Sequence, residues 1–439
     1  MNVYTRITLI LFMAPLVVGQ SKTSSKHVPA ATSPSASTLI AINVKGTRYK
    51  PADVIAVSGL RLGQNVTEQS FKAASAKLGG SGLFTDIAYS YSYSSAGMKL
   101  DLDLVDNAEL VPVRFENFVW YSDQELIEKL HAQLGLFDGK LPLGGSLNDE
   151  VAELLSGMIA THNPRLHATY LRSAPSPDSA KVDSVVFSAS GVPIQIRKVV
   201  YSGNNPELAA PLADVAKKME GQEYLRSKLR YFASTDARSV YLRQGYLKAD
   251  FGVPEPTVVS EEQEKVIVDV KLPVTEGLQY KLSSIEWAGD NSFPPDKLQR
   301  MVHLIPERPV NAVQLDEDLN SVRKLYGTRG YLNAKTMPET DFNDSQGSVA
   351  YKLVIKTGDQ YHFGEVDFDG LDEKSKARLR EDWHLREGEP YDSSYPARFV
   401  RESSGDLPTG VHWKITPHES INEDEKTVDV TMTYAPAES

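Results

Sequence analysis

Two stretches of the chain share one pattern, Tyr241-Leu-Arg-Gln-Gly-Tyr-Leu-Lys-Ala249 and Leu325-Tyr-Gly-Thr-Arg-Gly-Tyr-Leu-Asn-Ala334. In each, a run typical of a helix ends at a glycine that is followed by a tyrosine. A helix that ends in a left-handed residue favours glycine there, because glycine has no Cβ atom to clash. The pattern therefore predicts helices that end at Gly245 and Gly330, and it indicates an internal repeat.

Outward from these glycines, the chain repeats a unit of roughly 70 to 86 residues. Each unit opens with a β-rich segment that ends in a turn, and helix-start signals follow, such as Ser122 with Glu125 three residues later. Apolar residues at helical spacing, clearest at Leu315, Leu319 and Val322, predict a second helix that packs on a sheet. Four second helices are predicted to end at structural glycines, namely Gly82, Gly245, Gly330 and Gly410. The second unit has Asn163-Pro164 instead.

Two strands are predicted to close each unit. In residues 87–93, Ile87 and three tyrosines alternate with alanine and serine, as a half-buried strand requires. We therefore predict an α+β protein, an elongated tandem of five β-α-α-β-β units, each a three-stranded mixed sheet with two helices on one face. The predicted units are 38–107, 110–192 (divergent), 194–276, 279–357 and 360–435.

The first residues predict export. Arg6 precedes an apolar run from Ile7 to Val18, which ends in small residues, so residues 1–19 are interpreted as a signal peptide. An uncleaved tail or membrane anchor is the alternative. Residues 20–37 are rich in small polar residues and proline and are predicted to be a disordered linker.

Composition excludes several functions. The net charge is −11 without a basic cluster, so nucleic acid is not an expected partner. The chain has no cysteine, which excludes disulfides, thiolate metal sites and cysteine nucleophiles. Its nine histidines are dispersed, and His162 and His167 do not share a helical face. We predict no catalytic residues, no metal, no cofactor and no small-molecule substrate, and therefore no enzyme.

The Gly-Tyr motifs, with the junctions Val274-Thr-Glu-Gly-Leu-Gln-Tyr280 and Ile355-Lys-Thr-Gly-Asp-Gln-Tyr361, resemble polypeptide-transport-associated (POTRA) domains. The resemblance covers residues 38–435. Five such units in a row are similar to the periplasmic arm of the outer-membrane assembly factor BamA family, in which a membrane barrel follows the arm. The sequence ends at Ser439, so we expect the arm without the C-terminal barrel. The resemblance implies the periplasm, or the periplasmic face of the outer membrane, of a Gram-negative bacterium.

In such a unit the middle strand in sequence lies at the edge of the sheet. An open edge can bind an extended polypeptide by main-chain hydrogen bonds, a mode called β-augmentation. Proline residues near several of these strands, such as Pro254, Pro338 and Pro417, favour the alternative that the edges are blunted borders. The edge strands are predicted at residues 87–93, 246–253, 331–337 and 411–417. The predicted polypeptide-binding residues lie on these strands: Ile87, Tyr89, Ser90, Tyr91, Ser92, Tyr93, Tyr246, Lys248, Tyr331, Asn333 and Lys335.

The predicted function is a non-enzymatic scaffold or chaperone-like adaptor for outer-membrane or secreted protein assembly. Its expected partners are polypeptide clients or an outer-membrane barrel protein. The alternative is an architectural rod in an envelope complex that binds no client. A third hypothesis, an exported hydrolase, has no support in the sequence.

Overall fold

The computed structural model describes residues 37–176, 179, 181–290, 292–403 and 412–436. The predicted signal peptide, the predicted linker apart from Ser37, and Gly410 lie outside the described residues. The chain divides into two compact units. One comprises residues 1–200, 216–231 and 253–272, and the other comprises residues 201–215, 232–252 and 273–439.

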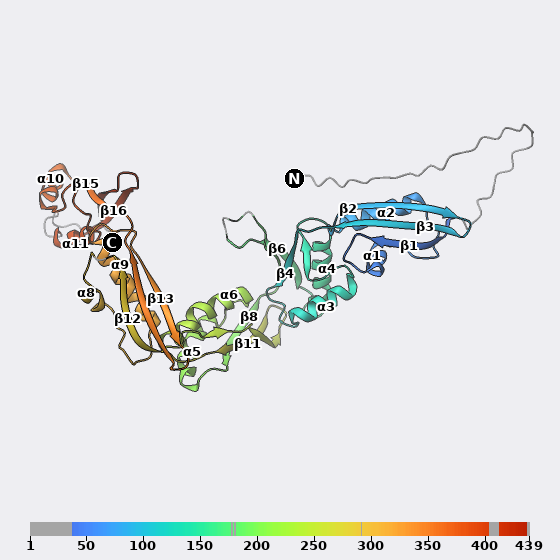
Figure 1. Cartoon of the computed structure of the whole chain (residues 1–439), viewed down its shortest axis with the longest axis horizontal. Helices are drawn as coiled ribbons and strands as arrows, with labels where there is room; N and C mark the ends of the chain where they lie inside the picture. The colour runs from blue at the N-terminus through green and yellow to red at the C-terminus, as the bar shows by residue number, and fades with distance from the viewer. Residues whose placement is uncertain (1–36, 177–178, 180, 291, 404–411, 437–439) are drawn as a thin grey trace, which may run out of the picture. The chain divides into compact units, whose positions relative to one another are not determined.

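In the described part of the chain, the strands form five small sheets, which follow one another along the sequence (Figure 1). Parallel and antiparallel pairs occur within the same sheets, so the prediction of an α+β protein with small mixed sheets is confirmed. Three sheets have three strands, as predicted. The second and third sheets have four, because the short strands β5 and β9 also pair.

The first sheet has the predicted topology. Its third strand lies between the first and second, in the order β1-β3-β2, with β1 parallel and β2 antiparallel to β3. A parallel pair needs a long crossover connection, and the two helices supply it. Its elements are β1 (Leu39–Lys45), α1 (Pro51–Ser58), α2 (Glu68–Gly80), β2 (Phe84–Ser94) and β3 (Gly97–Asp106).

The second sheet has the order β5-β4-β7-β6. The predicted capping box is present at the start of its first helix, where the Ser122 hydroxyl accepts a hydrogen bond from the Glu125 N–H. Its second helix ends in the right-handed residue Thr161, in keeping with the absence of the usual glycine. The elements are β4 (Leu110–Phe115), α3 (Asp123–Gln133), β5 (Lys140–Pro142), α4 (Leu147–Ala160), β6 (His167–Ser173) and β7 (Ser184–Ser190).

The third sheet has the order β10-β11-β8, with β9 also paired to β11. Its second helix is interrupted by a π-helical turn at Ala233–Ala237. The other elements are β8 (Ile194–Ser202), a 3-10 turn (Pro206–Leu208), α5 (Ala209–Ala216), a second 3-10 turn (Lys217–Met219), α6 (Arg226–Phe232), α7 (Arg238–Arg243), β9 (Asp250–Phe251), β10 (Glu255–Glu261) and β11 (Val266–Thr275).

The fourth and fifth sheets repeat the topology of the first, with the orders β12-β14-β13 and β15-β17-β16. The repeat that forms the fourth sheet consists of β12 (Lys281–Gly289), α8 (Pro295–Gln299), α9 (Ala312–Gly327), β13 (Lys335–Asn343) and β14 (Ser348–Lys356). The repeat that forms the fifth sheet consists of β15 (His362–Asp369), α10 (Glu373–Asp382), α11 (Tyr395–Glu402), β16 (Trp413–Asn422) and β17 (Thr427–Pro436). Among the helices of the described residues, none combines the length and the apolar character that a bilayer crossing needs.

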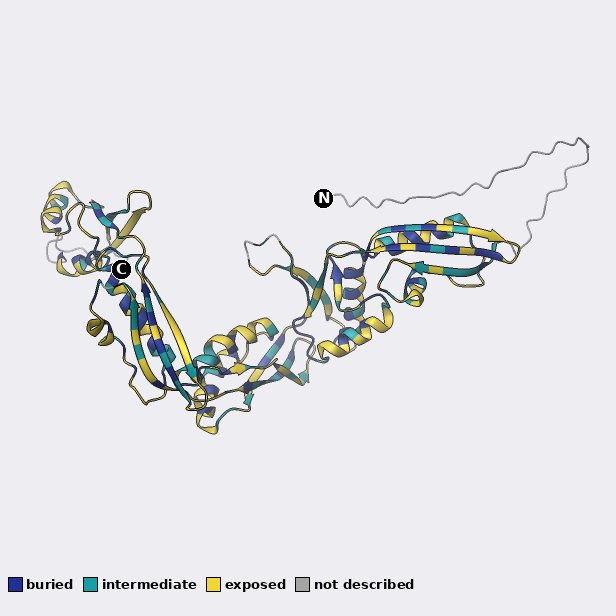
Figure 2. Cartoon of the chain, in the orientation of Figure 1, coloured by how far each residue is buried: buried dark blue, intermediate teal, exposed yellow. Residues whose placement is uncertain are grey.

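The buried residues lie between the sheets and their helices (Figure 2). In the central strand β3, Leu100, Leu102 and Leu104 face this core and are at most 2% exposed. The predicted apolar stripe of α9 is buried in the same way, and it includes Leu315, Leu319 and Val322. Each fully buried leucine contributes roughly 1.5 to 3 kcal/mol to folding. Each sheet therefore gains its stability from local packing.

Two of the predicted edge strands were placed too early in the sequence. Residues 246–249 and 331–334 form turns, closed by hydrogen bonds from Ala249 N–H to the Tyr246 carbonyl and from Ala334 N–H to the Tyr331 carbonyl. Apolar residues in these turns, such as Leu247, Ala249 and Ala334, are buried without being part of a strand. The long edge strands β10 and β13 begin only at Glu255 and Lys335.

Truncation of Leu102 to alanine tests how much the hydrophobic core between the first sheet and its helices contributes to stability. Because the side chain is buried in the central strand, Leu102→Ala should lower the free energy of unfolding of this sheet by about 2 to 5 kcal/mol. Pulse proteolysis across a urea series would measure the loss. The exposed Lys99→Ala on the same strand is the matched control and should change stability by less than about 0.5 kcal/mol. Equal effects of the two substitutions would contradict this description of the core.

Candidate functional site

The structure separates the predicted polypeptide-binding residues into two groups. Those from residues 87–93 lie on β2, at one edge of the first sheet, and Lys335 is the first residue of the edge strand β13. The other four lie on no strand but in the turns after Gly245 and Gly330; they are Tyr246, Lys248, Tyr331 and Asn333. For these four, the placement on a sheet edge was wrong.

The β2 edge is long and free of proline. The strand pairs with β3 along one side, from Phe84 opposite Asp106 to Ser94 opposite Gly97. Its other side is the border of the sheet, since the strand order is β1-β3-β2. Ser90 and Ser92 are exposed small side chains that leave the main chain accessible. Such an edge can accept another extended strand.

A row of aromatic residues lies beside this edge. Tyr89 and Tyr91 pack against Phe71 of α2, with ring centroids 6.3 and 5.2 Å apart, and Tyr91 meets Tyr93 edge-on at 5.5 Å. Exposure rises along the row from 4% at Tyr89 to 67% at Tyr93. The end of β2 therefore offers apolar ring surface to any segment that pairs with the strand.

The other edge strands differ in their proline content. Prolines lie within β10, β13 and β16, where Pro256 pairs with Val270, Pro338 with Leu353 and Pro417 with Met432. Proline has no N–H to offer a docking strand, so these edges are interrupted. The edge strand β6 of the second sheet lacks proline, and Leu171 on it is 59% exposed. Sequence reasoning missed β6, because the divergent second unit gave no clear motif there.

The turn residues belong instead to joints between successive repeats. At the first joint, the main-chain N–H of Tyr280 donates to the Gly245 carbonyl over 2.8 Å, and the Tyr280 carbonyl accepts from Val310 N–H at 3.0 Å. The side chain of Gln279 adds a bond to the Gln244 carbonyl at 2.8 Å. Main-chain hydrogen bonds through Tyr280 therefore connect Gly245 of one repeat to Val310, which lies just before a helix of the next repeat.

The second joint repeats these contacts residue by residue. Tyr361 N–H donates to the Gly330 carbonyl at 2.8 Å, and the Tyr361 carbonyl accepts from Tyr391 N–H at 2.9 Å. Gln360 donates its side-chain N–H to the Arg329 carbonyl, again at 2.8 Å. Both tyrosines are 1% exposed. The Gly-Tyr and Gln-Tyr motifs of the sequence are therefore the two halves of one joint.

Each joint tyrosine also bonds to a hairpin turn of its own repeat. The Tyr280 hydroxyl donates to Asp344 at 2.7 Å, and the Tyr361 hydroxyl donates to Glu423 at 2.6 Å. Residues of the preceding repeat complete the contact: Lys248 pairs with Asp344 at 2.8 Å, and Asn333 donates to the Tyr361 hydroxyl at 3.2 Å. Two of the misplaced residues thus connect neighbouring repeats.

These contacts shift the pKa values of Asp344 and Tyr361. Hydrogen bonds from Lys248 and then from Tyr280 lower the pKa of Asp344. Since a lowered folded-state pKa stabilises the ionised form, the contribution of Asp344 is present at neutral pH and is lost as the pH falls through that pKa. The hydrogen bond to Glu423 is the main cause that raises the pKa of Tyr361. The phenol therefore remains a donor at neutral pH.

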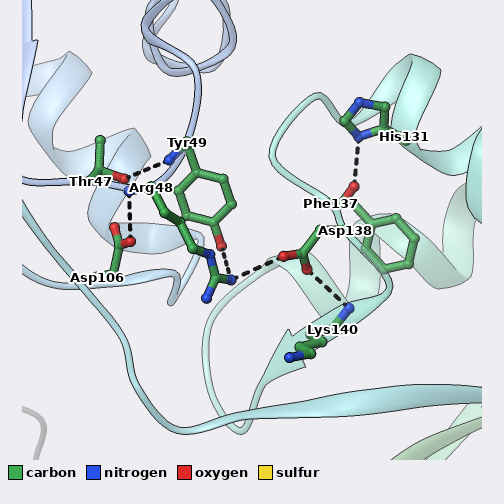
Figure 3. Close-up of polar contacts among 8 residues, drawn as sticks. All are labelled: Thr47, Arg48, Tyr49, Asp106, His131, Phe137, Asp138 and Lys140. Atoms are coloured by element: carbon green, nitrogen blue, oxygen red, sulfur yellow. Dashed lines mark hydrogen bonds and ion pairs between the residues drawn. The ribbon is translucent and has the colours of Figure 1, made fainter.

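A different polar contact joins the first and second repeats, where the Arg48 guanidinium donates to Asp138 at 3.1 Å (Figure 3). Within the first repeat, the same guanidinium donates to the Tyr49 hydroxyl at 2.9 Å, and the Arg48 main-chain N–H donates to Asp106 at 3.0 Å. A cavity of about 680 Å³ is also lined by residues of both repeats, including Val57, Leu83, Leu134, Leu136 and Leu147. Here too the helix-ending glycine, Gly82, lies against the next repeat, at Gly144.

Known proteins share this repeat. Residues 280–358 match the family model described as POTRA, surface antigen variable number repeat. The chain is also similar to the outer membrane protein assembly factor BamA of Buchnera aphidicola, with 24% identity over 157 residues, 36% of this chain and 25% of the relative. The factor of the same name from Neisseria meningitidis is 22% identical over 210 residues, 45% of this chain and 26% of the relative.

Among solved structures, a crystal structure of Haemophilus influenzae BamA POTRA3-5 aligns with 55% of this chain and 95% of that chain, at 22% identity and a TM-score of 0.41. The chain spans about a quarter of the length of the curated relatives that it matches. The predicted resemblance to a tandem of POTRA domains, similar to the periplasmic arm of BamA, is confirmed.

Substitution of Gly330 tests the second joint. This residue has a φ of 82°, and a Cβ atom there would lie 2.2 Å from the Tyr361 carbonyl oxygen. Gly330→Ala combines backbone strain with a main-chain clash and should lower stability by roughly 3 kcal/mol or more. Differential scanning calorimetry of the whole chain would report the change.

Gly388→Ala is the matched control for Gly330→Ala. It has a similar φ of 78°, but nothing lies within 4 Å of the added atom. It carries the backbone strain alone and should cost about 1 kcal/mol. If the two variants melted alike, the close contact between Gly330 and Tyr361 would not exist in solution.

Proposed function

We propose that this chain is a periplasmic, non-enzymatic scaffold that handles polypeptides during outer-membrane or secreted protein assembly. It binds extended segments by β-augmentation, and the principal binding edge is β2. The observation that carries this proposal is the proline-free border of β2, eleven residues from Phe84 to Ser94, beside the Phe71 and tyrosine row.

The chemistry of this edge suits a client without a fixed sequence. Main-chain N–H and C=O groups recognise any extended strand, because every residue except proline offers both. The aromatic row beside the strand would favour clients with apolar side chains on alternate positions, which are typical of the strands of outer-membrane barrels. The named function of the relatives, outer membrane protein assembly, supports the same class of client.

The joints support a second role. Main-chain bonds at Tyr280 and Tyr361 hold neighbouring repeats in register, as a spacer in an envelope complex requires. In this alternative the repeats set distances and bind no client. The edge and the joints are separate surfaces, so a single experiment at the edge distinguishes the two roles.

Site-specific photo-crosslinking tests client binding. A photoreactive residue at Ser90 or Ser92 should capture an unfolded outer-membrane barrel polypeptide that is diluted from urea into the purified chain. The same residue at Thr416, which is exposed on the proline-interrupted edge strand β16, is the matched control. We expect several-fold more adduct at the β2 positions, because β2 contains no proline whereas Pro417 interrupts the main-chain donors of β16.

Equal capture at Ser90, Ser92 and Thr416 would contradict binding at the β2 edge. No capture at any of the three would favour the architectural role. A photoreactive residue at Lys335, where β13 begins ahead of Pro338, should give an intermediate yield.

A further inference from the structure

The β2 edge lacks the features that usually keep a free sheet edge from pairing. Natural edge strands are blunted by charged side chains or by proline. The edge strands β6, β10, β13 and β16 each contain at least one charged residue, and the last three also contain proline. Residues 87–94 of β2 contain neither. An edge of this kind is expected to pair with another strand.

The sequence of this edge reads the same in both directions. Residues 89–93 are Tyr-Ser-Tyr-Ser-Tyr, with Tyr91 at the centre. The strands of an antiparallel pair run in opposite directions, so an edge that meets a second copy of itself meets its own sequence reversed. A two-fold axis through Tyr91 places Tyr89 of one copy opposite Tyr93 of the other. Every tyrosine then lies opposite a tyrosine, and every serine opposite a serine.

We propose that the β2 edge pairs with the β2 edge of a second copy of this chain, in an antiparallel arrangement centred on Tyr91. The two three-stranded sheets join into one sheet with the order β1-β3-β2-β2-β3-β1. The inference builds on the proposed function, because it assigns a regulatory partner to the same edge. A client and a second copy compete for the same main-chain groups, so pairing of two copies covers the edge until a client displaces one of them.

The tyrosine row gains contacts from this pairing. The Tyr93 side chain is 67% exposed in the single chain, whereas that of Tyr89 is 4% exposed. Pairing sets these two side chains opposite each other across the seam, and aromatic residues in that position attract. Phe71 of α2 packs on the same row, against Tyr89 and Tyr91. The apolar surface of one copy therefore continues into that of the other.

The charges around the seam do not oppose the pairing. Residues 88–94, which form the seam, include no charged side chain. On the serine face, Lys99 and Asp101 lie on β3, one strand away from the seam, and have opposite charges. The two β3 strands of the joined sheet are three strand spacings apart, about 14 Å, which exceeds the Debye length of about 10 Å. On the tyrosine face, Glu68 and Lys72 of α2 form an ion pair of 2.8 Å.

The seam is small, which suits a reversible partner. Stable complexes use roughly 20 to 30 residues on each side, far more than residues 88–94 provide. We therefore expect a dissociation constant of roughly 1 μM to 1 mM for the pair. A client that covers the edge and the tyrosine row together can displace a partner held this weakly.

Cysteine cross-linking of the full chain tests the pairing. The protein has no cysteine, so Ser90→Cys and Ser92→Cys each add a single thiol at an exposed position, with little change in side-chain size. Residues directly opposite have Cβ atoms about 4.5 to 5.5 Å apart, close to the separation in a disulfide, whereas diagonal neighbours are about 7 to 8 Å apart. Under a mild oxidant, an equal mixture of the two variants should give several-fold more disulfide-linked dimer than either variant alone.

The matched control is a mixture of Thr416→Cys and His418→Cys, both at exposed positions on the edge strand β16 that Pro417 interrupts. This mixture should give no excess of linked dimer over its separate variants. The inference is overturned if the Ser90→Cys and Ser92→Cys mixture also gives no excess, or if the β16 mixture gives the same excess.

This measurement contains no client, so it can fail independently of the proposed function. Capture of a barrel polypeptide at Ser90 without linked dimer would refute only the pairing of two copies. Linked dimer without client capture would support the pairing and refute only client binding at β2. Where both occur, an excess of unfolded barrel polypeptide should lower the yield of linked dimer several-fold, and an unchanged yield would contradict the competition.

Discussion

The hydrogen bond from a tyrosine N–H to the carbonyl of a left-handed glycine is the constraint on which two joints of this chain depend. It occurs at Tyr280 with Gly245 and at Tyr361 with Gly330, and both bonds are 2.8 Å long. Glycine is required because the next repeat's main chain lies where a Cβ atom would be. The same residue therefore ends a helix and contacts the following repeat, which links the local fold to the order of repeats.

This arrangement leaves the β2 edge outside the two Gly-Tyr joints. Those two joints use turns and helix ends, and none of their main-chain bonds involves a residue of β2. The edge strands pair on one side alone within their sheets, and prolines interrupt those of the third, fourth and fifth repeats. The difference between these edges and the uninterrupted β2 follows from one property of proline, its missing N–H. Rigidity and polypeptide binding can thus be altered independently.

Most of the fold could be predicted from the sequence, because its signals are local. Helix-ending glycines, the capping box at Ser122 and the alternation in residues 87–93 depend on neighbouring residues alone. The roles of Lys248 and Asn333 could not be predicted, since their partners Asp344 and Tyr361 are distant in sequence. The strands β5 and β9 were missed because strands of two or three residues carry no detectable period. His162 was considered only with His167 as a possible metal-ligand pair, and its contact with Glu261 could not be predicted because the two residues are distant in sequence.

Native-state hydrogen exchange at the Tyr280 and Tyr361 amides is the most direct test of the joints. These N–H groups lie outside the strands, yet both are buried and bonded to the preceding repeat. If the joints hold neighbouring repeats together, the two amides should exchange as slowly as those of the central strands β14 and β17. Exchange as fast as in the exposed turn at 343–347 would contradict the account, because the repeats would then separate without unfolding.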